Sequence, residues 1–221
     1  MPIAQNLSTR SAEAKKGSGS LFESLQKELS SAGIKARSID STKWFMQRVK
    51  QIPALHELKV LKDPIMINKN QPTIGKMFIF KYNPKLKRDL PYYDKFPLII
   101  MLGRAAKGFY GLNFHYLPLK LRAKFLDNLM DLASSHVLDE EVKIRLSYKM
   151  LSSASKFKEF KPCLKHYLYK HIQSQVKMIP APDWEIAIFL PTEKFVYETK
   201  TTVWAESKKI ILSTPSKKNN L

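Results

Sequence analysis

Residues 96–117 read FPLIIMLGRAAKGFYGLNFHYL, two apolar segments with a short loop between them. The first segment, 96–102, is continuous and apolar, as expected of a strand that is buried on both faces. The second, 108–117, is rich in aromatic residues, which favour strands. Two further runs have a similar character, IGKMFIFKY at 74–82 and WEIAIFL at 184–190. The four runs predict a small antiparallel sheet or an SH3-like barrel.

Amphipathic helices are expected before these strands. At 21–31 apolar residues recur with helical spacing, and Gly33 follows as the residue that ends the helix. Asp40 or Ser41 can cap a second helix, which ends before the proline at position 53.

A helical insert is predicted between the third and fourth strands, at 118–178. Its helices are expected at 118–133, 139–153 and 162–178. In the last of them, apolar residues recur every four positions and would pack inward: Leu164, Leu168, Ile172 and Val176. The lysines of this helix would then form a basic face toward solvent or a ligand.

These elements predict an α+β fold with an N-terminal helical arm, a small antiparallel sheet and a three-helix basic insert. The start of the chain is small and polar, as in a disordered arm. The expected organisation is an arm at 1–20, a helical region with a connector at 21–73, a core domain at 74–205 and a polar tail at 206–221.

The net charge limits the class of partner. The chain has 38 Lys and Arg against 19 Asp and Glu, a net charge of +19. Such an excess destabilises the folded state by self-repulsion, which a polyanion relieves. No apolar run approaches the roughly 18 residues of a spanning helix, and the N-terminus lacks the apolar stretch of a secretory signal. Nucleic acid is therefore expected as the partner, and a membrane is not.

Two groups of residues are candidates for nucleic-acid binding. The first is a basic and aromatic loop: Lys81, Lys85, Lys87, Arg88, Tyr92 and Tyr93. The second lies at 143–177, where nine basic residues accompany one acid, and its candidates are Lys156, Lys158, Lys161, Lys165, Lys170 and Lys177. Because lysine dominates, contacts to phosphates are expected rather than reading of base edges. The alternative for the two tyrosines is packing beside the neighbouring prolines.

Catalytic patterns are weak. No glycine-rich phosphate-binding loop occurs, and the histidines lack the spacing of metal ligands. Cys163 is the single cysteine and is expected to be a small buried hydrophobe. Asp183, Glu198 and Lys200 loosely match a nuclease pattern in which carboxylates hold a metal. We expect a protein that is not an enzyme, with no cofactor, no metal and no small-molecule substrate.

Three strings carry a family resemblance: FKYNPKLKRDLPYYDKFPLIIMLGRAAKGFYGLNFHYLPLKLRAKFLD at 80–127, FKEFKPCLKHYLYKHI at 157–172 and WEIAIFLPTEKF at 184–195. With them the chain resembles the DNA end-protector proteins of T-even-type contractile-tailed bacteriophages. The resemblance implies a minor virion protein that binds the ends of the linear double-stranded genome. It implies a place in the virion and, after DNA delivery, in the host cytoplasm.

The resemblance also implies a mechanism, which is steric shielding of the DNA ends from a host exonuclease without sequence specificity. Other virion proteins would be further partners. Two alternatives stay open at this point. One is a structural subunit of the head, neck or baseplate that contacts DNA, and the less favoured one is a metal-dependent nuclease.

Overall fold

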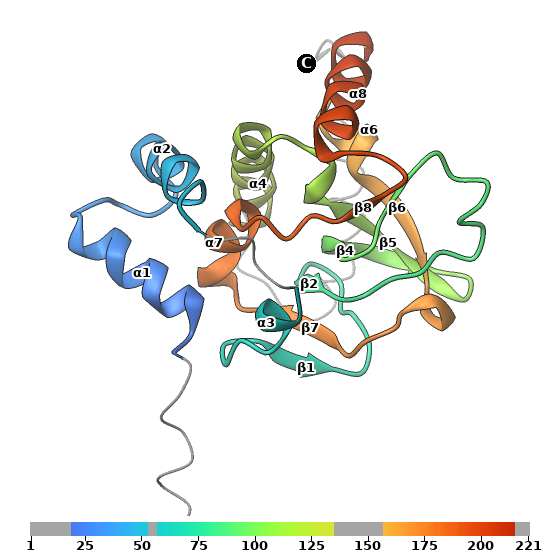
Figure 1. Ribbon diagram of the computed structural model, residues 1–221, viewed down its shortest axis with the longest axis horizontal. Helices are drawn as coiled ribbons and strands as arrows, with labels where there is room; N and C mark the ends of the chain where they lie inside the picture. Colours follow the sequence, from blue (N-terminus) through green and yellow to red (C-terminus); the bar gives the residue numbers. More distant parts are fainter. Residues whose placement is uncertain (1–18, 53–56, 135–156, 215–221) are drawn as a thin grey trace, which may run out of the picture.

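The computed structural model describes residues 19–52, 57–134 and 157–214. Its centre is an antiparallel six-stranded sheet with helices packed to one side (Figure 1), which confirms the predicted α+β class. The strand order is β1-β7-β2-β4-β5-β6, so β6 and β1 are the edges. The strands are β1 (Ile67–Lys69), β2 (Met77–Ile79), β4 (Leu98–Ala105), β5 (Gly108–Asn113), β6 (Leu164–Leu168) and β7 (Val176–Ile179).

A separate ribbon pairs β3 (Tyr93–Asp94) with β8 (Phe195–Val196). The helices are α1 (Leu21–Ser31), α2 (Ile39–Arg48), α3 (Glu57–Leu61), α4 (Leu119–Ser134), α6 (Phe160–Cys163), α7 (Trp184–Phe189) and α8 (Lys200–Ser213). Three single turns of 3-10 helix connect them: η1 (Phe114–Tyr116), η2 (Tyr169–His171) and η3 (Ala181–Asp183). None of the described helices is long and apolar enough to cross a lipid bilayer.

The main core lies between the sheet and the helices. Successive residues of a strand point to opposite faces, so Met77 and Ile79 of β2 face this core, while Phe78 faces the other side. Helix α7 lies in the middle, and all six of its residues are buried. Its Phe189 stacks on Phe45 of α2 with ring centroids 5.1 Å apart. The central strands β2 and β4 are buried on both faces, as the apolar run at 96–102 indicated, whereas the edge strand β1 is exposed.

The opposite face of the sheet encloses an aromatic cluster. Phe80, Phe109 and Tyr167 pack there with rings in edge or stacked contact, at centroid distances of 5.5 to 6.0 Å. The chain beyond β2 also pairs with the chain before β7 through a bridge between Tyr82, a member of this cluster, and Ile172, which packs against it. The predicted SH3-like arrangement stays a prediction.

The N-terminal helices begin and end at capping residues. Ser20 accepts a hydrogen bond from the Glu23 backbone N–H at the start of α1, and Gly33 has φ of +66° just past its end, as predicted. Helix α2 starts earlier than predicted. Its cap is Ser38, which forms a reciprocal capping box with Ser41.

The predicted helix at 162–178 is wrong. This segment contains part of α6, the edge strand β6, the turn η2 and the strand β7. A spacing of four residues is also a multiple of the two-residue period of a strand, so the pattern does not distinguish the two structures. Aromatic and β-branched residues in YLYKHI favour the strand. The three-helix insert is thereby corrected, since the segment at 162–178 forms no helix that could carry the predicted basic face.

The predicted strand at 184–190 is also wrong, because these residues form α7. A short run that is apolar throughout is equally compatible with a helix that is buried on all sides. The predicted helix at 118–133 is confirmed by α4, and the strand at 96–102 by β4. The strand at 108–117 is confirmed by β5 as far as Asn113, after which η1 follows. The helix predicted at 139–153 lies outside the described residues. Helix α8 runs into the predicted polar tail, and the domain boundaries stay predictions.

Candidate nucleic-acid interface

The first group of predicted cations lies on the loop between β2 and β3. Lys85, Lys87 and Arg88 are exposed to solvent, and none of the three forms an ion pair with another described residue. Lys81 is half-buried, and its backbone N–H donates to the Ser174 hydroxyl at 2.8 Å. The loop is thus fixed to the sheet at its start, while its three cations are available to a ligand.

The two predicted tyrosines are half-buried beside this loop. The Tyr92 hydroxyl donates to Glu206 of α8 at 2.7 Å, and its ring lies 6.0 Å from that of Tyr116. Burial, together with the Glu206 carboxylate, raises the pKa of Tyr92. Tyr93 lies edge-on to Tyr197 at 6.0 Å. Both rings therefore pack against the protein, and their contact with DNA stays a prediction.

The second group of predicted cations is dispersed over several elements rather than along one helix. Lys161 lies in α6, Lys165 in β6, Lys170 in η2 and Lys177 in β7. Lys158 is half-buried just before α6, while Lys156 lies outside the described residues. The Lys177 ammonium donates to the Asn68 side chain of β1. These lysines belong to the sheet and its connections.

Acidic residues are nearly absent from the sheet. Residues 64–117 contain nine Lys and Arg and only two Asp, and residues 160–182 contain four Lys and no acid. These two segments include all six strands. Of the two aspartates, Asp94 is 3% exposed, so Asp89 is the one that reaches the surface. The charge excess of the described chain is therefore concentrated on the sheet and its loops.

Two cations that sequence reasoning missed lie at the tip of the β4–β5 hairpin. Arg104 and Lys107 are both exposed there. The tip lies against η2, because the Lys107 carbonyl accepts from the Tyr169 backbone N–H at 3.1 Å, and η2 in turn bonds to the β2–β3 loop. These elements share one side of the sheet, at the right of Figure 1. The sequence signal for these two residues was a short loop that contains two cations and no acid. We call the resulting surface the basic edge: Lys85, Lys87, Arg88, Arg104, Lys107 and Lys170.

A cavity of about 340 Å³ lies between the β2–β3 loop and β6. Its walls are mainly aromatic and apolar and carry one lysine. The lining residues are Tyr82, Pro84, Leu90, Pro91, Tyr92, Tyr93, Asp94, Tyr116, Leu164, Lys165, His166 and Tyr167. The cavity thus brings together the two predicted tyrosines and one predicted lysine from separate parts of the chain.

The ammonium of Lys165 lies beside an aromatic ring rather than beside a carboxylate. Its ammonium lies 3.9 Å from the centroid of the Tyr116 ring, in a cation–π contact. Burial lowers the pKa of Lys165, and the nearby Cys163 opposes that effect. No described carboxylate forms an ion pair with it. Cys163 itself is buried, as predicted, and burial raises the pKa of its thiol.

A buried polar network holds the floor of this region. Asp94 accepts from His115 Nδ1 at 2.7 Å, and His115 Nε2 lies 3.0 Å from the Thr192 hydroxyl. The Asn113 amide also donates to Asp94, at 3.0 Å. The order Asp–His–hydroxyl is that of a hydrolase triad, but Thr192 is only 3% exposed. The network joins β3, η1 and the segment before β8, and so it anchors the loop.

A second buried network centres on Arg122, which is 0% exposed. Its guanidinium donates to the carbonyls of Leu117 and Ile188 at 2.7 and 3.0 Å and lies 3.3 Å from the Glu193 carboxylate. Burial disfavours ionisation of Glu193, but Arg122, His115 and Lys200 outweigh it and hold its pKa at about 2. This ion pair joins α4 to the segment between α7 and α8.

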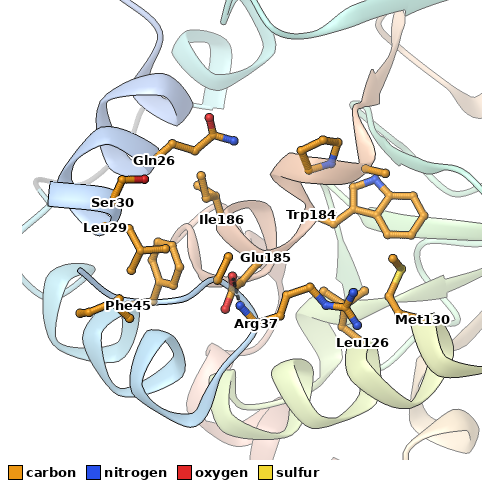
Figure 2. Close-up of a pocket in the computed structure, with 14 residues that line it drawn as sticks. Gln26, Leu29, Ser30, Arg37, Phe45, Leu126, Met130, Trp184, Glu185 and Ile186 are labelled. Atoms are coloured by element: carbon orange, nitrogen blue, oxygen red, sulfur yellow. Dashed lines mark hydrogen bonds between the residues drawn. The ribbon is translucent and has the colours of Figure 1, made fainter. Parts of the chain in front are cut away.

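A larger cavity of about 530 Å³ lies on the helical side, among α1, α2, α4 and α7 (Figure 2). Its cation, Arg37, lies 3.7 Å from Asp127. The Glu185 carboxylate accepts from the Ser41 hydroxyl at 2.6 Å and from the Arg37 backbone N–H at 2.8 Å. Because its charges are paired within the protein, this cavity is a weaker candidate for a phosphate than the one beside β6.

The residues of the nuclease pattern have different partners. Asp183 accepts from Gln26 of α1 at 2.8 Å, whereas Lys200 pairs with Glu193 at 3.1 Å, and Glu198 is exposed. Across residues 19–52, 57–134 and 157–214, no group of three or more His, Cys, Asp and Glu side chains is placed to hold a metal ion.

Fold and charge together define a basic α+β protein whose sheet carries a surface suited to a polyanion. The chain belongs to the phage T4 terminal DNA protecting protein family, whose model matches residues 5–211. The resemblance to the DNA end-protector proteins is thereby confirmed. A search of curated proteins found no match, and a search of solved structures found none either.

Proposed function

We propose that this protein binds the ends of a linear phage genome without sequence specificity and sterically shields them from a host exonuclease. The observation that carries the proposal is the near absence of acid from the sheet, whose two segments hold nine and four cations. Lysine and arginine side chains without a neighbouring carboxylate can neutralise DNA phosphates and release the counterions bound there, whatever the base sequence. Membership of the end-protecting family supports the choice of DNA termini as the target.

The proposed mechanism needs no chemical step. The basic edge would hold the last phosphates of the duplex, and the folded domain would occupy the space that a nuclease needs to engage the end. Four of the six cations of the basic edge are lysines, which contact phosphates as point charges. This composition supports positioning on the backbone rather than recognition of bases.

The proposal includes a place of action. A protein that shields genome ends would be carried in the virion and would act in the host cytoplasm after DNA delivery. Other virion proteins that contact the packaged end would be its neighbours, and the host exonuclease would be its competitor.

A protection assay tests this function. Linear duplex is mixed with a processive exonuclease and with the protein at only a few copies per DNA molecule. We expect full-length DNA to persist at this ratio, because only the two ends need to be occupied. Protection that required enough protein to coat the duplex would contradict end binding.

A parallel incubation of DNA with the protein and magnesium, without exonuclease, tests the absence of an enzymatic activity. We expect the DNA to remain intact. Cleavage there that an Asp183→Ala, Lys200→Ala variant lacked would support the nuclease alternative instead.

A further inference from the structure

The cavity beside β6 adjoins the basic edge and differs from it in character. The basic edge is open and cationic, whereas the cavity is enclosed by the β2–β3 loop on one side and the edge strand on the other. We propose that this cavity receives the unpaired terminal nucleotide of a DNA end, with its phosphate on Lys165 and its base against the tyrosine rings. This inference rests on the proposed function and gives it a site.

The size of the cavity limits what it can hold. A volume of about 340 Å³ is at the lower end of the range for small-molecule sites, which is about 300–1,000 Å³. A duplex cannot enter such a space, so the ligand must leave the base stack. Unstacking costs least for a nucleotide that is already unpaired, and at a terminus it breaks stacking on one side only. An end is therefore the place on linear DNA where this cavity is most easily filled.

The lining supplies what a free base needs. Tyr92 and Tyr93 are half-buried in the wall, and Tyr116, which also lines the cavity, is buried. Aromatic rings stack on any base, because every base has a π-face. The loop also exposes Leu90, which lines the cavity at 38% exposure. A bound nucleotide would cover this apolar side chain without requiring a particular base.

Lys165 supplies the charge. Its ammonium is largely removed from water and has the Tyr116 ring rather than a carboxylate as its partner. A cation in such a place lacks part of its hydration. A phosphate would make up for the missing water by accepting a charge-assisted hydrogen bond from the ammonium.

The acid of the cavity wall is already engaged. The two carboxylate oxygens of Asp94 accept from His115, Asn113 and the Phe96 backbone N–H. The carboxylate is therefore held by the protein, and Lys165 is the charged residue of the wall whose ammonium remains available to a phosphate.

The test compares two forms of one DNA sequence, a linear duplex with a one-nucleotide overhang at each end and a relaxed covalently closed circle. Each competes with labelled linear duplex for the protein. We expect the wild type to prefer the linear form by about 5- to 150-fold, the range that stacking of a single base supplies. Lys165→Met should lower this preference, because it removes the contact to the terminal phosphate, while keeping most of its affinity for the circle. The matched control is Lys170→Met on η2, which should weaken both forms by the same factor.

A second measurement uses the wild type alone and does not depend on how the variant folds. Excess deoxynucleoside 5′-monophosphate should lower the affinity for the linear form to that for the circle and leave the affinity for the circle unchanged. Retention of the full preference by a folded Lys165→Met protein, or equal displacement of both forms by the mononucleotide, would overturn the cavity as the site while leaving end binding intact. A wild type that bound both forms equally would instead reject end binding itself.

Discussion

Arg122 is the largest fully buried side chain of the described residues, and every hydrogen bond of its guanidinium goes to the protein. The backbone carbonyls of three residues and the Glu193 carboxylate accept these bonds, and the Trp204 ring lies 5.4 Å from the Arg122 Cζ atom. Removing one member of a buried ion pair leaves the other charge without compensation. The side chain therefore stabilises the junction between α4 and the C-terminal segment.

Arg122→Ala is expected to lower the free energy of unfolding by about 3–5 kcal/mol, measured by urea denaturation. Lys120→Ala on the same helix is the control, since Lys120 is exposed and such changes stay within about 0.5 kcal/mol. Similar values for the two variants would show that the buried pair contributes little.

Glu193 makes stability depend on pH in a defined window. Its pKa is lowered from 4.5 to about 2 in the folded state, so the ionised form stabilises the fold above about pH 4.5. This contribution is lost as the pH falls from about 4.5 to about 2. The wild type should therefore be more stable than Glu193→Gln at about pH 5, and the difference should shrink at about pH 3. A difference that stayed constant over this range would contradict the assigned pKa.

At the scale of elements, the contact of β5 with β6 depends on a missing side chain. A Cβ atom at Gly108 would lie 2.0 Å from the Tyr167 backbone carbonyl oxygen, whereas one at Gly103 would meet nothing within 4 Å. Since the obstacle at Gly108 is backbone, relief requires β6 to move. This strand carries Lys165, so its position also sets the width of the cavity.

Gly108→Ala is expected to destabilise the fold by about 1–3 kcal/mol or more and to speed amide hydrogen exchange in β6. Gly103→Ala, in the same hairpin, should stay within about 0.5 kcal/mol of the wild type. Comparable melting temperatures for both variants would mean that β6 adapts without cost.

Helices and strands could be predicted from the sequence where the spacing of apolar residues fits only one of the two structures. Where the spacing fits both a helix and a strand, the prediction failed. In helices α4 and α1 the apolar residues recur at helical spacing only, and the predictions of both helices were confirmed. The apolar residues from Leu164 to Val176 satisfy the helical and the strand period together. The strands that pair with them are far away in sequence, β5 for β6 and β1 and β2 for β7. Only tertiary pairing decides between the two structures. Helix α7 is buried on all sides, so its sequence lacks the alternation of apolar and exposed residues that reveals a helical period.

The kinds of residue in the candidate site could be predicted from the sequence, but their positions relative to one another in the folded molecule could not. Charge counting identified the segments that are nearly free of acid, because composition does not depend on which secondary structure a segment forms, and the binding role of their lysines stays a prediction. It missed Arg104 and Lys107, which join the others only through the contact of the hairpin tip with η2. The cavity was equally invisible, because Tyr92 and Lys165 meet only after the sheet has formed.

The distribution of charge predicts a dependence on salt. Affinity for random duplex should fall with a log–log slope of about −0.9 per phosphate neutralised. Replacing three exposed cations of the basic edge, Arg104, Lys107 and Lys170, by Gln should make this slope shallower by up to about 2.7. Gln at Lys27, Lys208 and Lys209, which are exposed on α1 and α8, is the matched control and should change it little. Equal slopes for the two triple variants would show that binding is not localised to the basic edge.

The strand order has a consequence for how the chain is made. Strand β7 lies between β1 and β2, although it is synthesised long after both. Until residue 176 leaves the ribosome, β1 has no partner in the sheet, and one side of β2 stays unpaired. At about 5–20 residues per second, this interval lasts on the order of 5–20 s. During that time the nascent chain exposes open strand edges that carry lysines such as Lys69 and Lys76. Because lysines on an edge discourage pairing with other chains, the same charges suited to DNA would keep the unfinished protein from aggregating.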